Sequence, residues 1–128
     1  MSQETPKIMV VEDEALVAKH IHTSLLEAGY EVTPIVSTGH DAIATARDTM
    51  PDLVIMDINL RGTMRGTEAA AYIYERFGIP IIFLTSKSQT EDVVEGFSIG
   101  GNDYLKKPFS MEELIVRVRN LLQRTQLQ

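Results

Sequence analysis

The chain has 128 residues, no cysteine and a formal net charge of -6. That length suits one domain with a real core, and a composition of 44% hydrophobic and 23% charged residues is ordinary for a soluble globular protein. The acidic balance argues against direct nucleic-acid binding, and without cysteine there is neither a disulfide nor a thiolate metal site. The start lacks a signal-peptide pattern, and no apolar run approaches the roughly 18 residues of a membrane span. We therefore expect a cytoplasmic domain without membrane contact.

Short apolar runs alternate with amphipathic stretches along the chain, beginning at residues 7–12, which predict a strand. An amphipathic helix is expected over residues 14–28, with Gly29 as its C-terminal stop. Residues 31–36 predict a second strand, and Pro34 favours a place for it at a sheet edge.

The middle of the chain repeats this alternation. A helix is expected over residues 39–49, ending before Pro51 because the residue before proline disfavours helix. Residues 52–58 and 80–84 are almost wholly apolar, which is typical of strands buried on both faces. Between them, residues 67–77 predict a helix that ends at Gly78.

The last part of the chain predicts a short helix over residues 90–99, a strand over residues 103–107 and a final helix. Ser110 with Glu113 three residues later has the pattern of a capping box at the start of that helix. Strands and helices that alternate at this spacing predict a parallel sheet with right-handed crossovers and helices on both faces.

A polar residue stands at the end of each of four apolar runs: Asp13, Asp57, Thr85 and Lys107. In a doubly wound parallel sheet, the ligand site lies at the carboxyl ends of the strands. We therefore expect these four side chains to meet at one edge, where two acids, a hydroxyl and an amine are the groups needed to handle a phosphoryl group and its metal.

Glu12 adds a third acid beside Asp13, with Asp57 expected across a narrow gap. Three neighbouring carboxylates repel one another and raise at least one pKa unless a cation lies among them. Because thiols and clustered imidazoles are missing, the pattern favours a hard cation with oxygen ligands, Mg²⁺ above all. One acid alone would more often simply solvate a strand end; three acids together with Lys107 favour the cation site.

Four motifs at these strand ends resemble the response-regulator receiver domain, the phosphoacceptor half of two-component signalling. The resemblance covers about residues 7–122 and implies a flavodoxin-like α/β fold, a doubly wound five-stranded parallel sheet in the order 2-1-3-4-5 with five helices. The motifs are Val10-Val11-Glu12-Asp13-Glu14, Leu53-Val54-Ile55-Met56-Asp57-Ile58, Leu84-Thr85-Ser86 and Asp103-Tyr104-Leu105-Lys106-Lys107-Pro108-Phe109.

The resemblance implies that Asp57 accepts the phosphoryl group of a phosphohistidine and forms an acyl phosphate. Asp13 and Asp57 would hold Mg²⁺ or Mn²⁺, with the backbone carbonyl of Asn59 as a further ligand and Glu12 acting mainly through water. The chain would then catalyse only its own phosphorylation and autodephosphorylation, and would not be an enzyme in the ordinary sense.

The resemblance also assigns the residues that respond to phosphorylation. Lys107, which directly precedes Pro108, would pair with Asp57 and then with a phosphoryl oxygen, and the Lys107–Pro108 bond would be cis. Thr85 would donate a hydrogen bond to the phosphoryl group, and Tyr104 would turn inward as a switch. Strand alternation places Lys106 on the other side, as a solvated lysine.

The chain departs from the family pattern in residues 60–66, the loop after the third strand. Arginine replaces the usual proline at position 61, and one extra residue precedes Gly66. Two interpretations stay open. Arg61 or Arg65 contacts the phosphoryl group or a partner, or both arginines are simply solvated. The departure puts loop geometry, the lifetime of the phosphoryl group and partner choice in doubt.

Two rival functions belong to other classes. A haloacid-dehalogenase-type phosphatase also forms an aspartyl phosphate, but it has a second aspartate two residues after the nucleophile, where this chain has Asn59. A flavodoxin-like electron carrier shares the sheet order, but its phosphate loop is rich in Ser, Thr and Gly, whereas the loop here is acidic.

We expect a receiver domain over residues 7–124, with a disordered tail at 1–6 and a second tail at 125–128. Its partners would be a sensor histidine kinase or histidine phosphotransfer protein and a downstream output domain or protein, without direct nucleic-acid contact. A homodimer through the face of the fourth helix, fifth strand and last helix is possible. A stand-alone receiver, a relay intermediate and a piece of a longer regulator or hybrid kinase all stay open.

Overall fold

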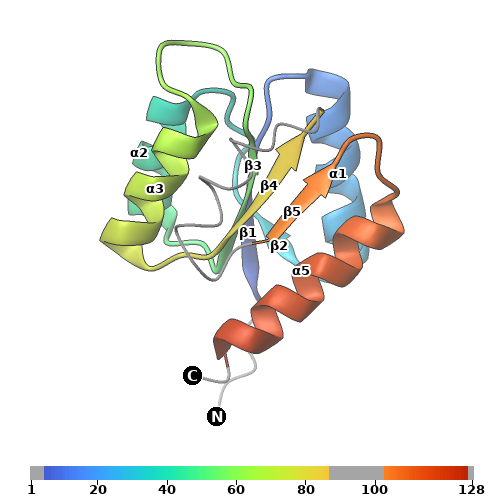
Figure 1. The fold of residues 1–128 in the computed structure, drawn as a ribbon. Coiled ribbons are helices and arrows are strands. Elements are labelled where there is room, and N and C mark those ends of the chain that lie inside the picture. Colours follow the sequence, from blue (N-terminus) through green and yellow to red (C-terminus); the bar gives the residue numbers. More distant parts are fainter. Residues whose placement is uncertain (1–4, 87–102, 127–128) are drawn as a thin grey trace.

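A computed structural model describes residues 5–86 and 103–126. Five parallel strands form one sheet in the order β2-β1-β3-β4-β5, as expected from the sequence, and four helices are described around it (Figure 1). The expected helix at 90–99 lies outside the described residues. The elements are β1 (Lys7–Val11), α1 (Ala15–Glu27), β2 (Glu31–Val32), α2 (Gly39–Thr49), β3 (Leu53–Asp57), α3 (Gly66–Phe77), β4 (Ile81–Thr85), β5 (Asp103–Lys106) and α5 (Met111–Gln126).

The helices cover both faces of the sheet, with α1 and α5 on one side and α2 and α3 on the other (Figure 1). Every residue of β3 and β4 is buried, because alternate side chains of a strand point into the two layers. Ile55 packs in the core beneath α1 and α5, and Met56 in the core beneath α2 and α3. Each large apolar side chain buried in this way contributes about 1.5–3 kcal/mol.

Several helix ends follow the expected local signals. Gly29 and Gly78 follow α1 and α3 with φ angles of 97° and 69°, a conformation that glycine adopts without steric cost. α2 ends before Pro51, with Met50 in the left-handed region. The expected cis bond between Lys107 and Pro108 is present.

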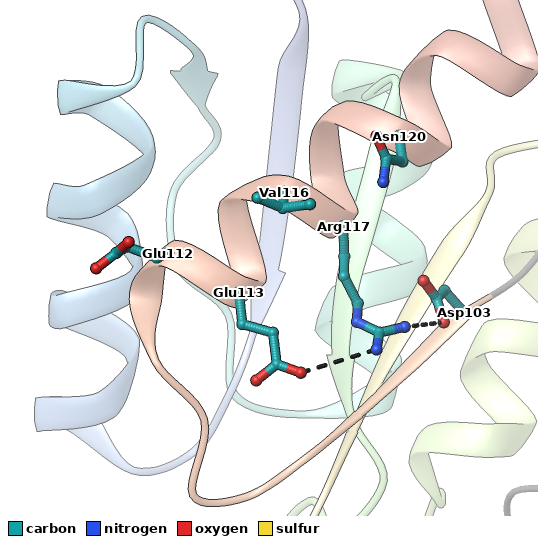
Figure 2. A pocket seen from close by; sticks show the side chains of 6 residues that line it. All are labelled: Asp103, Glu112, Glu113, Val116, Arg117 and Asn120. Carbon is teal, nitrogen blue, oxygen red and sulfur yellow. Dashed lines mark hydrogen bonds and ion pairs between the residues drawn. The ribbon is translucent and has the colours of Figure 1, made fainter.

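The last helix begins with half of the expected capping box. Ser110 Oγ accepts a hydrogen bond of 3.0 Å from the backbone N–H of Glu113. The Glu113 carboxylate lies 3.7 Å from Arg117, which also contacts Asp103 of β5 at 2.8 Å (Figure 2). The expected domain end at residue 124 falls inside α5, which continues to Gln126.

Within the described ranges, no helix combines the length and the apolar character that crossing a bilayer requires.

The second strand is shorter than expected, because β2 covers only Glu31–Val32 and not residues 31–36. The N–H groups of Glu31 and Thr33 donate to the carbonyls of Pro6 and Ile8, but the next bond comes from Val36 to Val10, so one extra residue beside Pro34 interrupts the regular ladder. Pairing with β1 resumes at one point, where Val36 bridges Val11. The prediction of an edge position was correct.

Gly66, the first residue of α3, lies against the end of β3. Its N–H donates a hydrogen bond of 3.2 Å to the carbonyl of Ile58. A Cβ atom at position 66 would overlap the backbone carbonyl of Asp57 and lie 3.0 Å from the Ile58 Cα. The close approach of α3 to this strand end therefore requires glycine.

Replacing Gly66 should consequently disturb the strand end. We expect Gly66→Ala to lower the free energy of unfolding by about 1–3 kcal/mol, since the new methyl group meets backbone that cannot move aside. Urea denaturation measures the change. Gly39→Ala is the matched control at the first residue of α2, because the three nearest atoms to its Cβ would all belong to the Met64 side chain, at 2.9–3.1 Å, and a loss below about 1 kcal/mol is expected. Equal losses in the two variants would contradict this account.

Candidate functional site

The sheet register brings the four expected strand-end residues to one edge. Asp57 pairs with Leu84 across β3 and β4, and Thr85 pairs with Lys106 across β4 and β5. β1 pairs with β3 in the same direction, so the residues that follow Val11 lie beside Asp57. The structure thus places Asp13, Asp57, Thr85 and Lys107 at the carboxyl ends of neighbouring strands.

Strand alternation decides which of these side chains share a face of the sheet. Asp57 lies two residues after Ile55, which packs in the core beneath α1 and α5. Lys107 lies two residues after Leu105, which packs in the same core. This shared direction lets Lys107 reach Asp57, while the neighbouring Lys106 is exposed.

The Lys107 ammonium lies among three carboxylates. Its Nζ is 3.1 Å from Asp57 Oδ2 and 3.1 Å from Glu12 Oε1, and it lies 3.6 Å from Glu14 Oε1 at the surface. Glu12 and Asp57 are only 2% and 3% exposed. Two such buried carboxylates require a charged partner, because an uncompensated buried charge is strongly destabilising.

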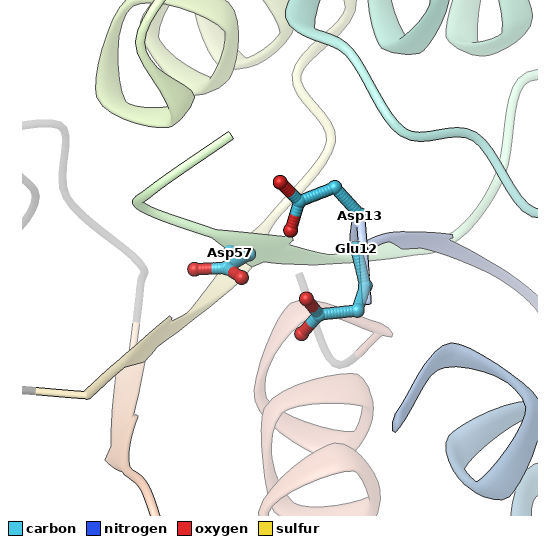
Figure 3. A group of neighbouring side chains, drawn as sticks. All are labelled: Glu12, Asp13 and Asp57. Carbon is cyan, nitrogen blue, oxygen red and sulfur yellow. The ribbon is translucent and has the colours of Figure 1, made fainter. Parts of the chain in front are cut away.

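Glu12, Asp13 and Asp57 form an acidic cluster whose carboxylates face one another (Figure 3). One oxygen from each residue can be chosen so that all three lie within 4.8 Å of one another. Such a set of oxygens fits a hard divalent cation that keeps part of its water shell, as Mg²⁺ does. The second Asp57 oxygen, Oδ1, accepts a hydrogen bond of 3.0 Å from the backbone N–H of Asn59.

The cluster changes the protonation of two of its members. Burial, a hydrogen bond with Asp57 and the charge of Asp57 together raise the pKa of Glu12 from 4.5 to about 7. Burial alone would lower the pKa of Lys107, but hydrogen bonds and charges from Glu12 and Asp57 outweigh it and raise that pKa above its usual value. Near neutral pH, Glu12 therefore titrates while Lys107 keeps its charge.

The two expected switch residues lie near the cluster in different surroundings. Thr85 ends β4 and is 1% exposed, and its carbonyl accepts a hydrogen bond of 2.7 Å from the Lys107 N–H. Tyr104 of β5 is 39% exposed, so its side chain lies outside the core in this structure.

The unusual loop of residues 60–66 adds a residue to the site that the sequence left undecided. Arg61 Nε lies 3.5 Å from Asp13 Oδ2. The backbone N–H of Arg65 donates a hydrogen bond of 2.9 Å to Glu68 Oε1 at the start of α3. No periodicity or motif could have signalled the Arg61 contact, because it depends on the path of an irregular loop.

Apart from the acidic cluster, a hollow of about 520 Å³ lies between β5 and α5. Figure 2 shows the ion pairs of Arg117 on its wall. It belongs to the face on which the sequence predicts a homodimer, and the helix expected to complete that face lies outside the described residues. The dimer stays a prediction. The lining residues are Asp103, Glu112, Glu113, Val116, Arg117 and Asn120.

Comparison with known proteins agrees with this architecture. The family model of the response regulator receiver domain matches residues 8–119 of the chain. The chain belongs to the response regulator receiver family. Receiver domains are the phosphoacceptor domains of two-component systems, so the function expected from the strand-end motifs is confirmed at this level.

The chain is also similar to three individual proteins. The DNA-binding response regulator MtrA of Mycolicibacterium paratuberculosis is 38% identical over 92% of the chain and 52% of its own length. The signal receiver domain of a modulated diguanylate cyclase from Desulfovibrio desulfuricans is 30% identical, with a TM-score of 0.88 over 97% of this chain and 98% of that chain. Chemotaxis protein CheY4 of Vibrio cholerae is 28% identical, with a TM-score of 0.84 over 92% of this chain and 99% of that chain. The chain spans about half the length of MtrA.

The raised pKa of Glu12 predicts a pH dependence of stability in the absence of metal. Because the folded-state pKa is about 7 and the ordinary value is 4.5, the folded state binds this proton more tightly than the unfolded state does. The resulting stabilisation is fully present below the ordinary pKa and is lost as pH rises through about 7. With a chelator present, we expect the Tm of the wild type to fall between about pH 5.5 and about pH 8 relative to Glu12→Gln, which lacks this titration. Parallel Tm profiles would contradict the assignment.

Proposed function

We propose that Asp57 accepts a phosphoryl group from the phosphohistidine of a sensor histidine kinase or a histidine phosphotransfer protein. The observation that carries this proposal is the setting of the Asp57 carboxylate, which is buried at a strand end and held at both oxygens. Lys107 Nζ lies 3.1 Å from Oδ2, and the Asn59 N–H lies 3.0 Å from Oδ1. A carboxylate held in this way would be positioned for the in-line attack that the proposal requires.

In the proposed transfer, an Asp57 oxygen attacks the phosphorus and forms an acyl phosphate. The phosphorus–nitrogen bond of the donor breaks, and its electron pair stays on the imidazole nitrogen. Phosphoryl transfer depends mainly on positioning and on neutralising charge. Lys107 supplies one positive charge beside the carboxylate before transfer and beside a phosphoryl oxygen after it.

The acidic cluster would hold the divalent ion, Mg²⁺ or Mn²⁺, that this chemistry uses. Glu12, Asp13 and Asp57 offer carboxylate oxygens within 4.8 Å of one another, and the backbone carbonyl of Asn59 is the proposed further ligand. When bound, the ion would neutralise charge on the phosphoryl oxygens and on the carboxylates.

The signal would leave the site through Thr85 and Tyr104. The Thr85 hydroxyl, at the end of β4, is the proposed hydrogen-bond donor to the phosphoryl group. Tyr104 is partly exposed on the neighbouring strand and would turn inward in the active state. Phosphorylation would favour that state by adding contacts that the resting state lacks.

The proposed action of the chain is confined to its own phosphorylation and autodephosphorylation. MtrA is named a DNA-binding response regulator, which supports an output domain or protein as the downstream partner. The receiver itself carries a net charge of -6, so we propose that it does not contact nucleic acid directly.

Intact-mass measurement tests the phosphoacceptor. After incubation with Mg²⁺ and a small donor such as acetyl phosphate, we expect the wild type to gain one labile phosphoryl group and Asp57→Asn to gain none. Asp48→Asn is the matched control, because it removes an exposed carboxylate of α2. Phosphorylation of the Asp57→Asn variant would overturn the assignment, and steady hydrolysis of many phosphoesters would instead support a phosphatase.

Thermal unfolding tests the metal site separately. Mg²⁺ at about ten times its Kd should stabilise the wild type by about 1.4 kcal/mol, since the ion binds only the folded cluster. Asp13→Asn should greatly reduce the resulting shift in Tm, whereas Asp48→Asn should retain it. Absence of a wild-type shift at millimolar Mg²⁺ would remove the metal assignment.

A further inference from the structure

We infer that Arg61 is a displaceable counterion of the acidic cluster, which holds Asp13 in the metal-free receiver and weakens the binding of a divalent cation. This inference rests on the proposed metal site and adds a residue that sets its affinity. It starts from one contact, in which Arg61 Nε lies 3.5 Å from Asp13 Oδ2.

The fold fixes the backbone from which Arg61 reaches Asp13. Arg61 forms a parallel bridge with Thr38, and the Thr38 hydroxyl in turn caps α2 by accepting a hydrogen bond of 3.1 Å from the Asp41 N–H. Gly62 then turns the chain with a φ of 96°, which favours glycine. The loop is therefore anchored to the start of α2 at the residue that carries the guanidinium.

The surroundings of the two cations at the site differ. The Lys107 side chain is 17% exposed and pairs with the two buried carboxylates of Glu12 and Asp57. The Arg61 side chain is 81% exposed and pairs with Asp13, whose side chain is itself 16% exposed. An ion pair with one exposed partner is weak, because water competes for the Arg61 guanidinium. Arg61 can thus leave Asp13 at little cost, whereas Lys107 cannot leave its partners.

A hydrated cation has access to Asp13 from the side of Arg61. A hollow of about 220 Å³ is lined by Asp13 and by loop residues from Ile58 to Arg65. Mg²⁺ keeps several waters when it binds, and the hollow beside Asp13 would leave room for them. A guanidinium at the same carboxylate both occupies Oδ2 and repels the incoming ion, so Arg61 and the cation compete.

Isothermal titration of the metal-free protein with Mg²⁺ tests the inference without a phosphoryl donor. At low ionic strength, Arg61→Gln should lower the Kd for Mg²⁺ by about 3- to 10-fold, the change expected when one unit charge is removed beside a divalent ion in water-like surroundings. The gain should shrink as salt is added, because the guanidinium is exposed.

Two control variants separate this effect from simpler ones. Arg61→Lys keeps the charge and should keep the wild-type Kd within about 2-fold. Arg47→Gln removes the same charge from an exposed pair of α2, in which Arg47 Nε lies 3.3 Å from Asp48 Oδ1, and should leave the Kd unchanged. Tightening in either control equal to that in Arg61→Gln would overturn the inference.

The outcomes also distinguish failure of this inference from failure of the proposed function. If the wild type binds Mg²⁺ and Arg61→Gln binds it with the same Kd, the counterion role is overturned and the metal site stands. If neither protein binds Mg²⁺ at millimolar concentration, the metal site and the counterion role fall together.

Discussion

The ion pairs of Lys107 with Glu12 and Asp57 are the interaction on which the site depends. They join the ends of β1, β3 and β5, which are far apart in the sequence, around one ammonium whose distance to each carboxylate is 3.1 Å. Without that cation, two buried carboxylates would face each other with no compensation. β4 lies between β3 and β5 in the sheet, so a long side chain is needed to reach across. Lysine meets this need and leaves its apolar stem against the sheet.

The same geometry separates Asp57 and Lys107 from Thr85. Asp57 and Lys107 continue the rows of Ile55 and Leu105, on the face covered by α1 and α5. Thr85 lies two residues after Phe83, which packs beneath α2 and α3. By strand alternation, Asp57 and Lys107 therefore point to one face, and the Thr85 side chain follows the other. A phosphoryl group on Asp57, as proposed, would have to connect the two faces, which favours the proposed readout role for Thr85 over a chemical one.

Local signals in the sequence predicted most of the fold. The bounds of α2 and the stops at Gly29 and Gly78 depend on backbone preferences that act within a few residues, and the apolar runs predicted the buried strands. The predicted second strand was too long, because the neighbouring strand decides whether the residues beyond Pro34 still pair. The resemblance to receivers supplied the proposed roles of the acids and of Lys107. It could not supply the contact of Arg61 with Asp13, since the loop departs from the family pattern at that position.

The charge balance of the site distinguishes its two cations, the exposed Arg61 and the more buried Lys107. When all three acids of the cluster are ionised, Lys107 and Arg61 together leave a single negative charge. A divalent ion together with Lys107 balances the three carboxylates completely, and Arg61 would then add an uncompensated positive charge. The exposed Arg61 guanidinium would therefore lose the least interaction energy on leaving the cluster. The Lys107 side chain is 17% exposed and is held by two buried acids. At the proposed metal site, burial and the two ion pairs of Lys107 would together make Arg61 the cation that yields to the metal and Lys107 the one that stays beside the proposed phosphoryl group.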